Sequence, residues 1–369
     1  MDAPNPQEKS TLIEYLWRRL RLNRRAIRFL LDEGPPWPQL WREARCEPLR
    51  LYRHLPEVWR KAPRAFLPAL GAADRAPGPY LTWADAEYPD GLRELADPPV
   101  VIYGAPKLPP FALDRPRIAV VGTRRASDYA KEITGELVSQ FRPFGAWVLS
   151  GMAWGIDGRA HRQALQSGLS TLGILGTPLL RPPVRSQVDL FMELKRQGHL
   201  ITELYPGAAV GSFRFPERNR IIAALAQAVV VVEAPAKSGA LITAELALEL
   251  GREVFVVPGP LRPHGNEGGH RLIQDGARLL THAREIFSVL GWGPTQSPNI
   301  PVLSPSREAL PSDSVAEQIL NLLSRGPLHI DKIIHISQKP APQVLAAMTR
   351  LTLEEWVQEL SGGVYKIFK

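Results

Sequence analysis

Hydrophobic and polar positions follow three different patterns along the 369-residue chain. Near the start, apolar residues recur at helical spacing in short stretches that prolines interrupt, as in the stretch 11–31. Over residues 117–290, short continuous apolar runs alternate with stretches of helical periodicity. After a proline-rich segment, three short amphipathic stretches precede two strand-like runs that flank Gly362-Gly363. These patterns predict a helical region, an α/β region and a small unit of helices and a hairpin.

The apolar runs of the middle region predict a parallel sheet with helices on both faces, because strands buried on both sides lack an alternating pattern. Six strands are expected at Ile118–Val121, Trp147–Leu149, Thr171–Leu175, Leu200–Thr202, Ala228–Val232 and Val254–Val257. Five helices are expected near Tyr129–Phe141, Gly158–Gln166, Val188–Lys195, Arg218–Leu225 and Leu241–Leu250. Such alternation is typical of a Rossmann-like, doubly wound α/β fold.

The chain is therefore expected to contain three domains and one linker. Residues 1–105 form an N-terminal helical domain, and residues 106–292 form the Rossmann-like domain. Residues 293–314 hold five prolines among Ser, Asn and Gln, a composition typical of a linker. Residues 315–369 are expected to form a winged helix with helices at 315–323, 330–336 and 342–353 and a hairpin at 357–368.

Composition narrows the possible functions only modestly. The formal net charge of +8 permits a polyanionic partner without requiring one. Six arginines between Arg18 and Arg28 indicate either a solvated helix face or a nucleic-acid contact. The single Cys46 excludes an internal disulfide and a cysteine-built zinc site. No signal peptide and no run of about 20 apolar residues is present, so a cytoplasmic protein without membrane association or bound metal is expected.

Glycines mark four strand ends, where the amides of helix N-termini bind anions in open parallel sheets. The segments are Gly122–Arg125, Ser150–Asp157, Gly176-Thr177 and Lys237–Thr243. Neither a G-x-G-x-x-G motif after the first strand nor a Walker A lysine loop is present, so no nucleotide cofactor is expected. Arg124 stands just past the first strand, where its guanidinium would reach a phosphate.

Two further groups of residues suggest chemistry. Phe213–Arg220 interleaves aromatic rings and cations, as single-stranded nucleic-acid sites do, so Trp154, Phe213 or Phe215 is expected to contact bases. Asp157 and His161 lie four residues apart and permit either an acid–base pair or a helix cap beside a structural histidine. The second interpretation is favoured, because no nucleophile or second carboxylate accompanies them.

Taken in order, these motifs resemble those of the DNA-processing protein A (DprA/Smf) family over nearly all of residues 117–290. The matching segments are Val121–Arg124 with Ser127 and Tyr129, Ser150–His161, Phe215–Ile222, Glu233-Ala234 with Ser238-Gly239 and Leu241–Ala244, Val257–Gly259, Gly268, Leu272-Ile273 and Gly276-Ala277. Two features depart from the family pattern: Ala130 replaces a glycine, and the loop 176–185 lacks the usual Gly-x-Asp, Tyr-Pro and Asn.

The resemblance implies a protein of natural transformation that binds and protects incoming single-stranded DNA. It also implies a homodimer through the central domain and a role in loading the RecA recombinase, with SAM-like N-terminal and DML1-like winged-helix accessory domains. We expect the DNA to stay chemically intact, so no catalytic residue is assigned. The residues expected to contact DNA are Gly122, Thr123, Arg124, Ser150, Gly151, Trp154, Phe215, Arg218, Asn219, Arg220, Lys237, Ser238 and Gly239.

Two alternatives stay open. The middle region is also similar to nucleoside monophosphate phosphoribohydrolases, in which case Gly239, Thr243 and Glu245 would form the site and Glu245 would stabilise an oxocarbenium-like state. Alternatively, the winged helix is the principal functional part, as in a regulator that binds duplex DNA. Its few cations, two arginines and four lysines within 315–369, make its electrostatic attraction for DNA weak.

Overall fold

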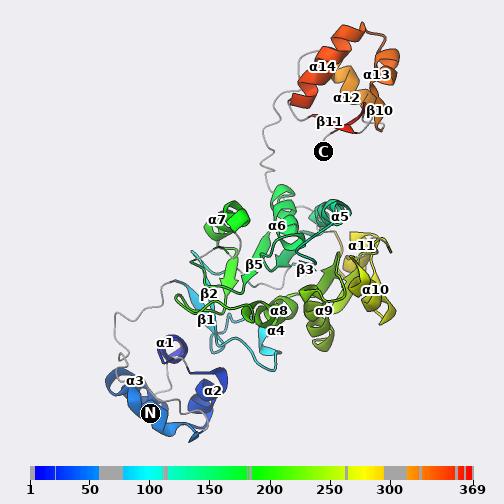
Figure 1. Ribbon diagram of the computed structural model, residues 1–369. Coiled ribbons are helices and arrows are strands. Elements are labelled where there is room, and N and C mark those ends of the chain that lie inside the picture. The colour runs from blue at the N-terminus through cyan, green and yellow to red at the C-terminus, as the bar shows by residue number, and fades with distance from the viewer. Residues whose placement is uncertain are drawn as a thin grey trace. The chain divides into compact units, whose positions relative to one another are not determined.

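A computed structural model gives two compact units, Met1–Pro298 and Asn299–Lys369 (Figure 1). The structure describes residues 5–20, 22–57, 78–109, 111, 115–180, 182, 185–261, 265–294, 314–323, 326–353, 356–360 and 363–367. Most of the predicted linker lies outside the described residues.

The N-terminal helices are α1 (Pro6–Arg18), α2 (Arg24–Asp32) and α3 (Trp37–Cys46), followed by the 3-10 helix η1 (Pro48–His54). The helical pattern over residues 11–31 is divided between α1 and α2, because the Asn23 side chain accepts a hydrogen bond from the Ala26 amide and caps α2. The Ser10 hydroxyl of α1 donates to the Asp85 carboxylate at 2.6 Å. The helices therefore lie against the first strands of the sheet.

A nine-stranded sheet forms the centre of the first unit, in the order β1-β2-β6-β5-β4-β3-β7-β8-β9. Its strands are β1 (Tyr80–Thr82), β2 (Val101–Gly104), β3 (Arg117–Val121), β4 (Trp147–Ser150), β5 (Thr171–Leu175), β6 (Leu200–Thr202), β7 (Ala228–Val231), β8 (Glu253–Val256) and β9 (Arg278–Leu279). The strands β6-β5-β4-β3-β7-β8-β9 run parallel to one another. Strands β1 and β2 are antiparallel to their neighbours. The predicted α/β fold is confirmed, and each predicted strand ends within one residue of its expected position.

Two features of this unit differ from the prediction. The expected boundary at residue 105 separates β2 from its sheet, because Tyr103 of β2 pairs with Thr202 of β6. Strands β1 and β2, with three and four residues, are too short for a recognisable period. Helix α8 (Arg214–Leu225) begins four residues before the expected Arg218. Pro216 does not prevent this, because a residue in the first helical turn needs no intrahelical partner for its nitrogen.

Helices cover both faces of the sheet, with α5 (Asp128–Ser139) and α6 (Ile156–Gln166) on one face and α8 and α9 (Gly239–Glu249) on the other (Figure 1). Strand β3 shows why, since Ala119 and Val121 pack in the core under α8 and α9 while Ile118 and Val120 pack under α5 and α6. The remaining helices of this unit are α4 (Asp90–Arg93), α7 (Val188–Gln197), α10 (Glu267–Gln274) and α11 (Ala283–Val289), with the 3-10 helices η3 (Arg142–Phe144) and η4 (Arg185–Gln187).

The chain reverses its direction across the sheet between β3 and β7. Strands β4, β5 and β6 follow β3 toward one edge, and β7 then returns to the other side of β3. The loops at the carboxyl ends of β3 and β7 consequently separate toward opposite faces. Such a switch point leaves a crevice in which open α/β sheets bind ligands.

The second unit contains three helices and a three-stranded antiparallel sheet. Its elements are α12 (Ser314–Leu323), β10 (Leu328–His329), α13 (Ile330–Ser337), α14 (Ala341–Leu353), β11 (Val357–Leu360) and β12 (Val364–Ile367). Ile319, Ile333, Val344 and Leu351 are fully buried in its own core. The predicted order of three helices and a terminal hairpin is confirmed.

Candidate functional site

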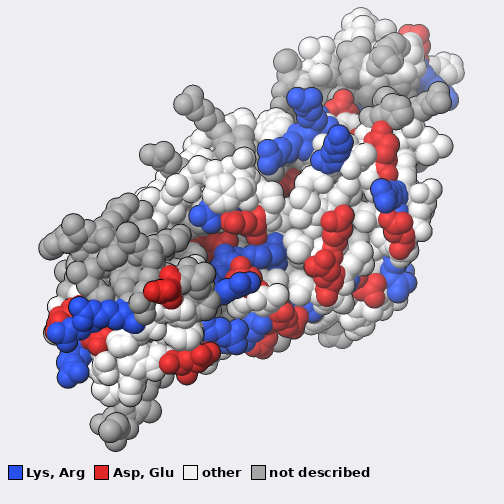
Figure 2. Space-filling model, turned by 60° about the horizontal axis from the view of Figure 1, so that its bottom comes forward, with Lys and Arg blue, Asp and Glu red and all other residues white. Residues whose placement is uncertain are grey.

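The surface charge of the first unit is largely paired. On the face in Figure 2, basic and acidic groups stand beside one another over much of the described surface. Arg252 pairs with Glu94 at 2.5 Å and Arg278 with Glu253 at 2.9 Å. The net charge of the chain therefore identifies no binding face by itself, and basic side chains without an acidic partner carry more information.

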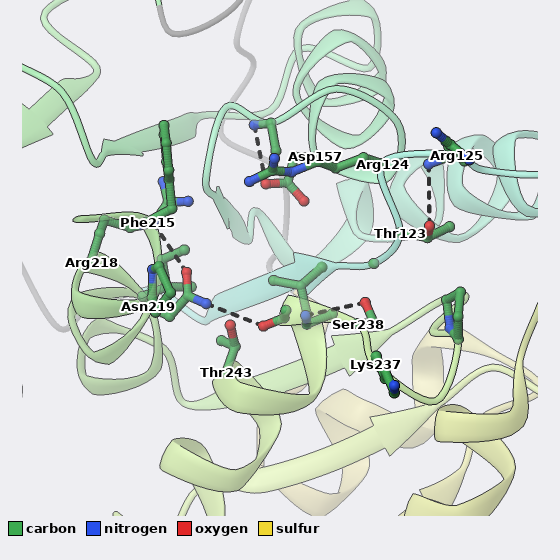
Figure 3. A pocket seen from close by; sticks show the side chains of 18 residues that line it. Thr123, Arg124, Arg125, Asp157, Phe215, Arg218, Asn219, Lys237, Ser238 and Thr243 are labelled. Atoms are coloured by element: carbon green, nitrogen blue, oxygen red, sulfur yellow. Dashed lines mark hydrogen bonds between the residues drawn. The ribbon is translucent and has the colours of Figure 1, made fainter. Parts of the chain in front are cut away.

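A pocket of about 380 Å³ lies at the switch point of the sheet (Figure 3). The loops after β3, β4 and β7 and the first turns of α8 and α9 surround it. Nine of the residues expected to bind DNA line it: Gly122, Thr123, Arg124, Phe215, Arg218, Asn219, Lys237, Ser238 and Gly239. The structure therefore brings together four sequence segments that the prediction treated separately.

Close packing shapes the loop after β3. A Cβ atom on Gly122 would lie 2.6 Å from Cγ1 of Ile156, the first residue of α6. The Thr123 amide donates to the Glu233 carbonyl at 2.7 Å and ties the end of β3 to the end of β7. Gly155 has a φ of 88°, and a Cβ atom there would lie 2.3 Å from the Thr123 carbonyl oxygen. Glycine at these two positions lets the loops meet at the pocket.

Three exposed cations stand at the pocket. Arg124, Arg125 and Lys237 are exposed, and none of them forms an ion pair with another residue that the structure describes. The guanidinium carbon of Arg124 lies 5.5 Å from the centre of the Phe215 ring, a cation–π arrangement. With the buried Arg218, four basic side chains line the pocket, and Asp157 is the one carboxylate among its described lining residues.

Arg218 is buried rather than exposed at this site. Its Nη1 donates to the Gly151 carbonyl at 2.6 Å and to the Ile174 carbonyl, and its Nε donates to Oδ1 of Asn219 at 3.2 Å. Burial lowers the pKa of Arg218 to about 10, against the opposing charge of Asp157. A Cβ atom on Gly151 would lie 2.5 Å from Nη2 of Arg218, so Gly151 makes room for the guanidinium. Arg218 therefore forms part of the pocket wall, and Gly151 lies behind it.

The start of α9 lies at the pocket. Ser238 caps the helix by accepting a hydrogen bond from the Ala240 amide at 3.3 Å. Gly239, the first helical residue, is exposed, and no protein atom lies within 4 Å of the position of a Cβ atom there. Nδ2 of Asn219 donates to the Gly239 carbonyl at 3.2 Å and joins α8 to α9. A helix N-terminus beside unpaired cations is a favourable place for an anion.

Comparison with known proteins identifies the family of the chain. The sequence model of the DNA recombination-mediator protein A family matches residues 79–291. The chain belongs to this family, also called DprA/Smf. A second family model, the DprA winged helix domain, matches residues 304–363. The resemblance and the winged helix predicted from the sequence are thereby confirmed.

Individual DprA/Smf relatives match most of their own length. The protein Smf of Escherichia coli K12 is 34% identical over 298 residues, which cover 79% of this chain and 78% of the relative. The X-ray structure of DprA from Streptococcus pneumoniae has a TM-score of 0.57 at 28% identity and covers 77% of this chain and 93% of that chain. DprA from Helicobacter pylori, whose structure is described as showing its single-stranded DNA binding mode, has a TM-score of 0.52 at 27% identity and covers 58% and 97% of the two chains.

Four of the expected DNA contacts do not line the DprA/Smf pocket: Ser150, Gly151, Trp154 and Arg220. The Ser150 hydroxyl is fully buried and donates to the Val120 carbonyl at 2.7 Å, so it faces the sheet. Trp154 is 51% exposed in the loop after β4. Arg220 pairs with Glu203 at 2.5 Å. Neither Ser150 nor Arg220 has a free polar group that faces the pocket. The structure therefore gives no support for their expected direct contact with DNA.

Asp157 and His161 have separate structural partners. The Asp157 carboxylate accepts hydrogen bonds from the Gly151 and Ala153 amides at 3.1 and 3.2 Å, and burial raises its pKa against the charge of Arg218. Nδ1 of His161 lies 2.6 Å from the Thr171 hydroxyl, which itself donates to a carbonyl at 2.8 Å. Nδ1 is therefore the donor, and the ring is neutral at pH 7 because burial lowers its pKa to about 3. The two side chains have structural partners, but the expected helix cap is wrong, because α6 begins after Gly155 with no side-chain cap and Asp157 binds the loop after β4 instead.

His161 predicts a specific pH dependence of stability. Burial lowers its pKa from 6.5 to about 3, so the unfolded chain takes up the proton first as the pH falls below 6.5. The stabilising contribution of the neutral ring is complete above pH 6.5 and is lost progressively toward pH 3. Between pH 6.5 and about 4.5, urea unfolding of the wild type is expected to lose about 2 kcal/mol more than that of His161→Gln.

The exposed His335 provides the control for this measurement, since His335→Gln should keep the pH dependence of the wild type. If the free energy of unfolding changed equally with pH in the wild type and in His161→Gln, the assignment of a neutral ring would be wrong.

The expected DNA contacts did not include Arg125, Pro235 and Thr243, which line the pocket, although Arg125 and Thr243 lie in the predicted glycine-marked segments. The signal for Arg125 was its position next to Arg124, whereas nothing local marks Pro235. Glu245, the carboxylate that the phosphoribohydrolase alternative requires, is exposed on α9 and does not line the pocket. The loop after β5 lines none of it among the described residues, and Arg181 lies outside them.

Two further searches cover the described residues only. Within them, no helix has the length and apolar character needed to cross a membrane. The same residues contain no group of three or more His, Cys, Asp or Glu side chains suited to hold a metal ion.

Proposed function

We propose that the pocket between β3 and β7 binds single-stranded DNA and leaves it chemically intact, as part of natural transformation in the cytoplasm. The observation that carries this proposal is the group of three exposed cations, without an ion-pair partner among the described residues, beside the N-terminus of α9. Cations next to a helix N-terminus favour phosphate groups. The relative from Helicobacter pylori, described as binding single-stranded DNA, supports the same ligand.

The shape of the pocket favours a single strand over a duplex. A space of about 380 Å³ accepts individual nucleotides, whereas a duplex keeps its bases stacked inside. Phe215, which lies under Arg124, offers a ring face to a base, and Trp154 offers a second exposed ring on the neighbouring loop. Stacking on such rings tolerates any base, so the proposed binding depends little on sequence.

Two further parts of the proposal rest on family membership. A homodimer through the central domain would place two such pockets on one strand, and the bound strand would be protected and passed to the RecA recombinase.

The proposal is tested by fluorescence anisotropy of the full chain with single-stranded and duplex oligonucleotides of one sequence over a salt series. The single strand should bind more tightly at every salt concentration. Gly239→Ala should lower that affinity about tenfold, because the added methyl group occupies open pocket space beside the phosphate, while the free energy of unfolding changes by less than about 1 kcal/mol.

Gly293→Ala is the matched control, since Gly293 is equally open, has no positive φ and does not line the pocket. This variant should bind like the wild type. Tighter binding to the duplex, or a normal affinity of Gly239→Ala, would contradict the proposed site.

A further inference from the structure

We propose that Arg24, Glu203 and Arg220 are positioning residues that couple the N-terminal helices to the DNA pocket by holding α8 in place. The inference rests on the proposed function for its DNA readout and on the geometry of the first unit for its mechanism. Arg24 is the first residue of α2, Glu203 follows β6, and Arg220 lies in α8. They come from three remote segments of the chain.

One buried carboxylate binds both arginines. Oε2 of Glu203 accepts a hydrogen bond from Nη2 of Arg24 at 2.6 Å and another from Nη2 of Arg220 at 2.5 Å. The Glu203 side chain is 5% exposed, and those of Arg24 and Arg220 are 15% and 12% exposed. A shielded carboxylate of this kind interacts with its cations more strongly than a surface pair does, because water screens it less.

Arg24 has further contacts besides Glu203. Arg24 also pairs with Asp97, and its guanidinium carbon lies 5.9 Å from the ring centre of Trp17. Burial lowers the pKa of Arg220, and the charge of Glu203 opposes that effect. Losing the carboxylate contact would leave a poorly solvated guanidinium on α8 without its counter-charge. Both arginines act within the protein and are not available to phosphates.

Helix α8 carries this contact to the pocket. Arg218 and Arg220 are two positions apart and point about 200° from each other around the helix. Arg218 binds the Gly151 and Ile174 carbonyls on one side, and Arg220 binds Glu203 on the other. The helix is therefore held at two places: Arg218 binds the ends of β4 and β5, and Arg220 binds Glu203 after β6, which also binds Arg24 of α2. Phe215 and Asn219, which line the pocket, lie on the clamped turns.

The test compares Arg24→Gln with Arg25→Gln in the full-length protein. Arg25 is the next residue of α2, is exposed, and forms no ion pair with another described residue. Arg24→Gln should weaken binding of a single-stranded oligonucleotide about tenfold, and Arg25→Gln should not. The salt dependence of Arg24→Gln should run parallel to that of the wild type, because no phosphate contact is removed.

A second readout does not depend on DNA. In the free protein, hydrogen exchange of the backbone amides from Arg218 to Leu225 should accelerate about tenfold in Arg24→Gln and stay unchanged in Arg25→Gln. Arg24→Lys should restore most of both properties, since an ammonium group still pairs with Glu203. If Arg24→Gln lost its fold, hydrogen exchange would accelerate throughout the sheet. The comparison of Arg24→Lys with the wild type would then test whether Arg24 positions α8.

Three results would overturn the inference. One is an Arg24→Gln affinity within about twofold of the wild type, and another is a salt slope reduced by about 0.7, which would make Arg24 a phosphate contact. The third is unchanged exchange in α8. Failure of the proposed function has a different signature, because the wild type would then not bind the oligonucleotide while exchange in α8 still responds to Arg24→Gln.

Discussion

Arg218→Ala is expected to lower the free energy of unfolding by about 3–5 kcal/mol, because it removes a buried guanidinium that binds two carbonyls and offsets the charge of a buried carboxylate. The guanidinium is 5% exposed and holds the Gly151 and Ile174 carbonyls, while the neighbouring Asp157 carboxylate is itself buried. The substitution leaves these carbonyls and the carboxylate without their donor or counter-charge. Urea unfolding followed by circular dichroism measures the change.

Arg214→Ala provides the control on the same helix. Arg214 pairs with Glu217 at 2.9 Å, and their side chains are 27% and 43% exposed. Such a pair contributes less than about 1 kcal/mol, so this variant should unfold close to the wild type. If Arg218→Ala were as stable as Arg214→Ala, the structural role of Arg218 would be wrong, and a role as a direct DNA contact would be favoured instead.

Arg124→Ala is expected to leave the fold intact and to weaken binding of single-stranded DNA about tenfold at low salt. Arg124 is exposed and has no carboxylate partner among the described residues, so its charge is free for a phosphate. Removing one phosphate contact should also reduce the slope of log affinity against log salt by about 0.7. Anisotropy titrations at four or more salt concentrations give both quantities.

Arg142→Ala separates this local effect from the general charge of the protein. Arg142 is exposed in the turn that precedes β4, at the amino-terminal edge of the sheet, and the pocket lies at the opposite edge. This variant removes the same charge and should bind with the wild-type affinity and slope. Identical titrations for Arg124→Ala and the wild type would show that the phosphate does not contact Arg124.

Much of the site could be predicted because parallel strands end at one edge of a sheet. Continuous apolar runs located β3 and β7, and the glycine-containing segments after them had to meet at their carboxyl ends. This reasoning placed Gly122, Arg124 and Gly239 at one pocket without knowledge of any contact. The order of the strands, which creates the crevice, was not predicted from the sequence and is known from the structure alone.

The sequence by itself determined the α/β architecture, the glycine-lined strand ends and the family, because these depend on local periodicity and on short motifs. Only the tertiary structure decided which polar side chains face the pocket. The Ser150 hydroxyl points into the sheet, Arg218 is buried in the wall, and Arg220 turns away toward Glu203. The physical reason is that a side chain's partner follows from packing between remote segments, as for Arg24 and Glu203, which lie 179 residues apart.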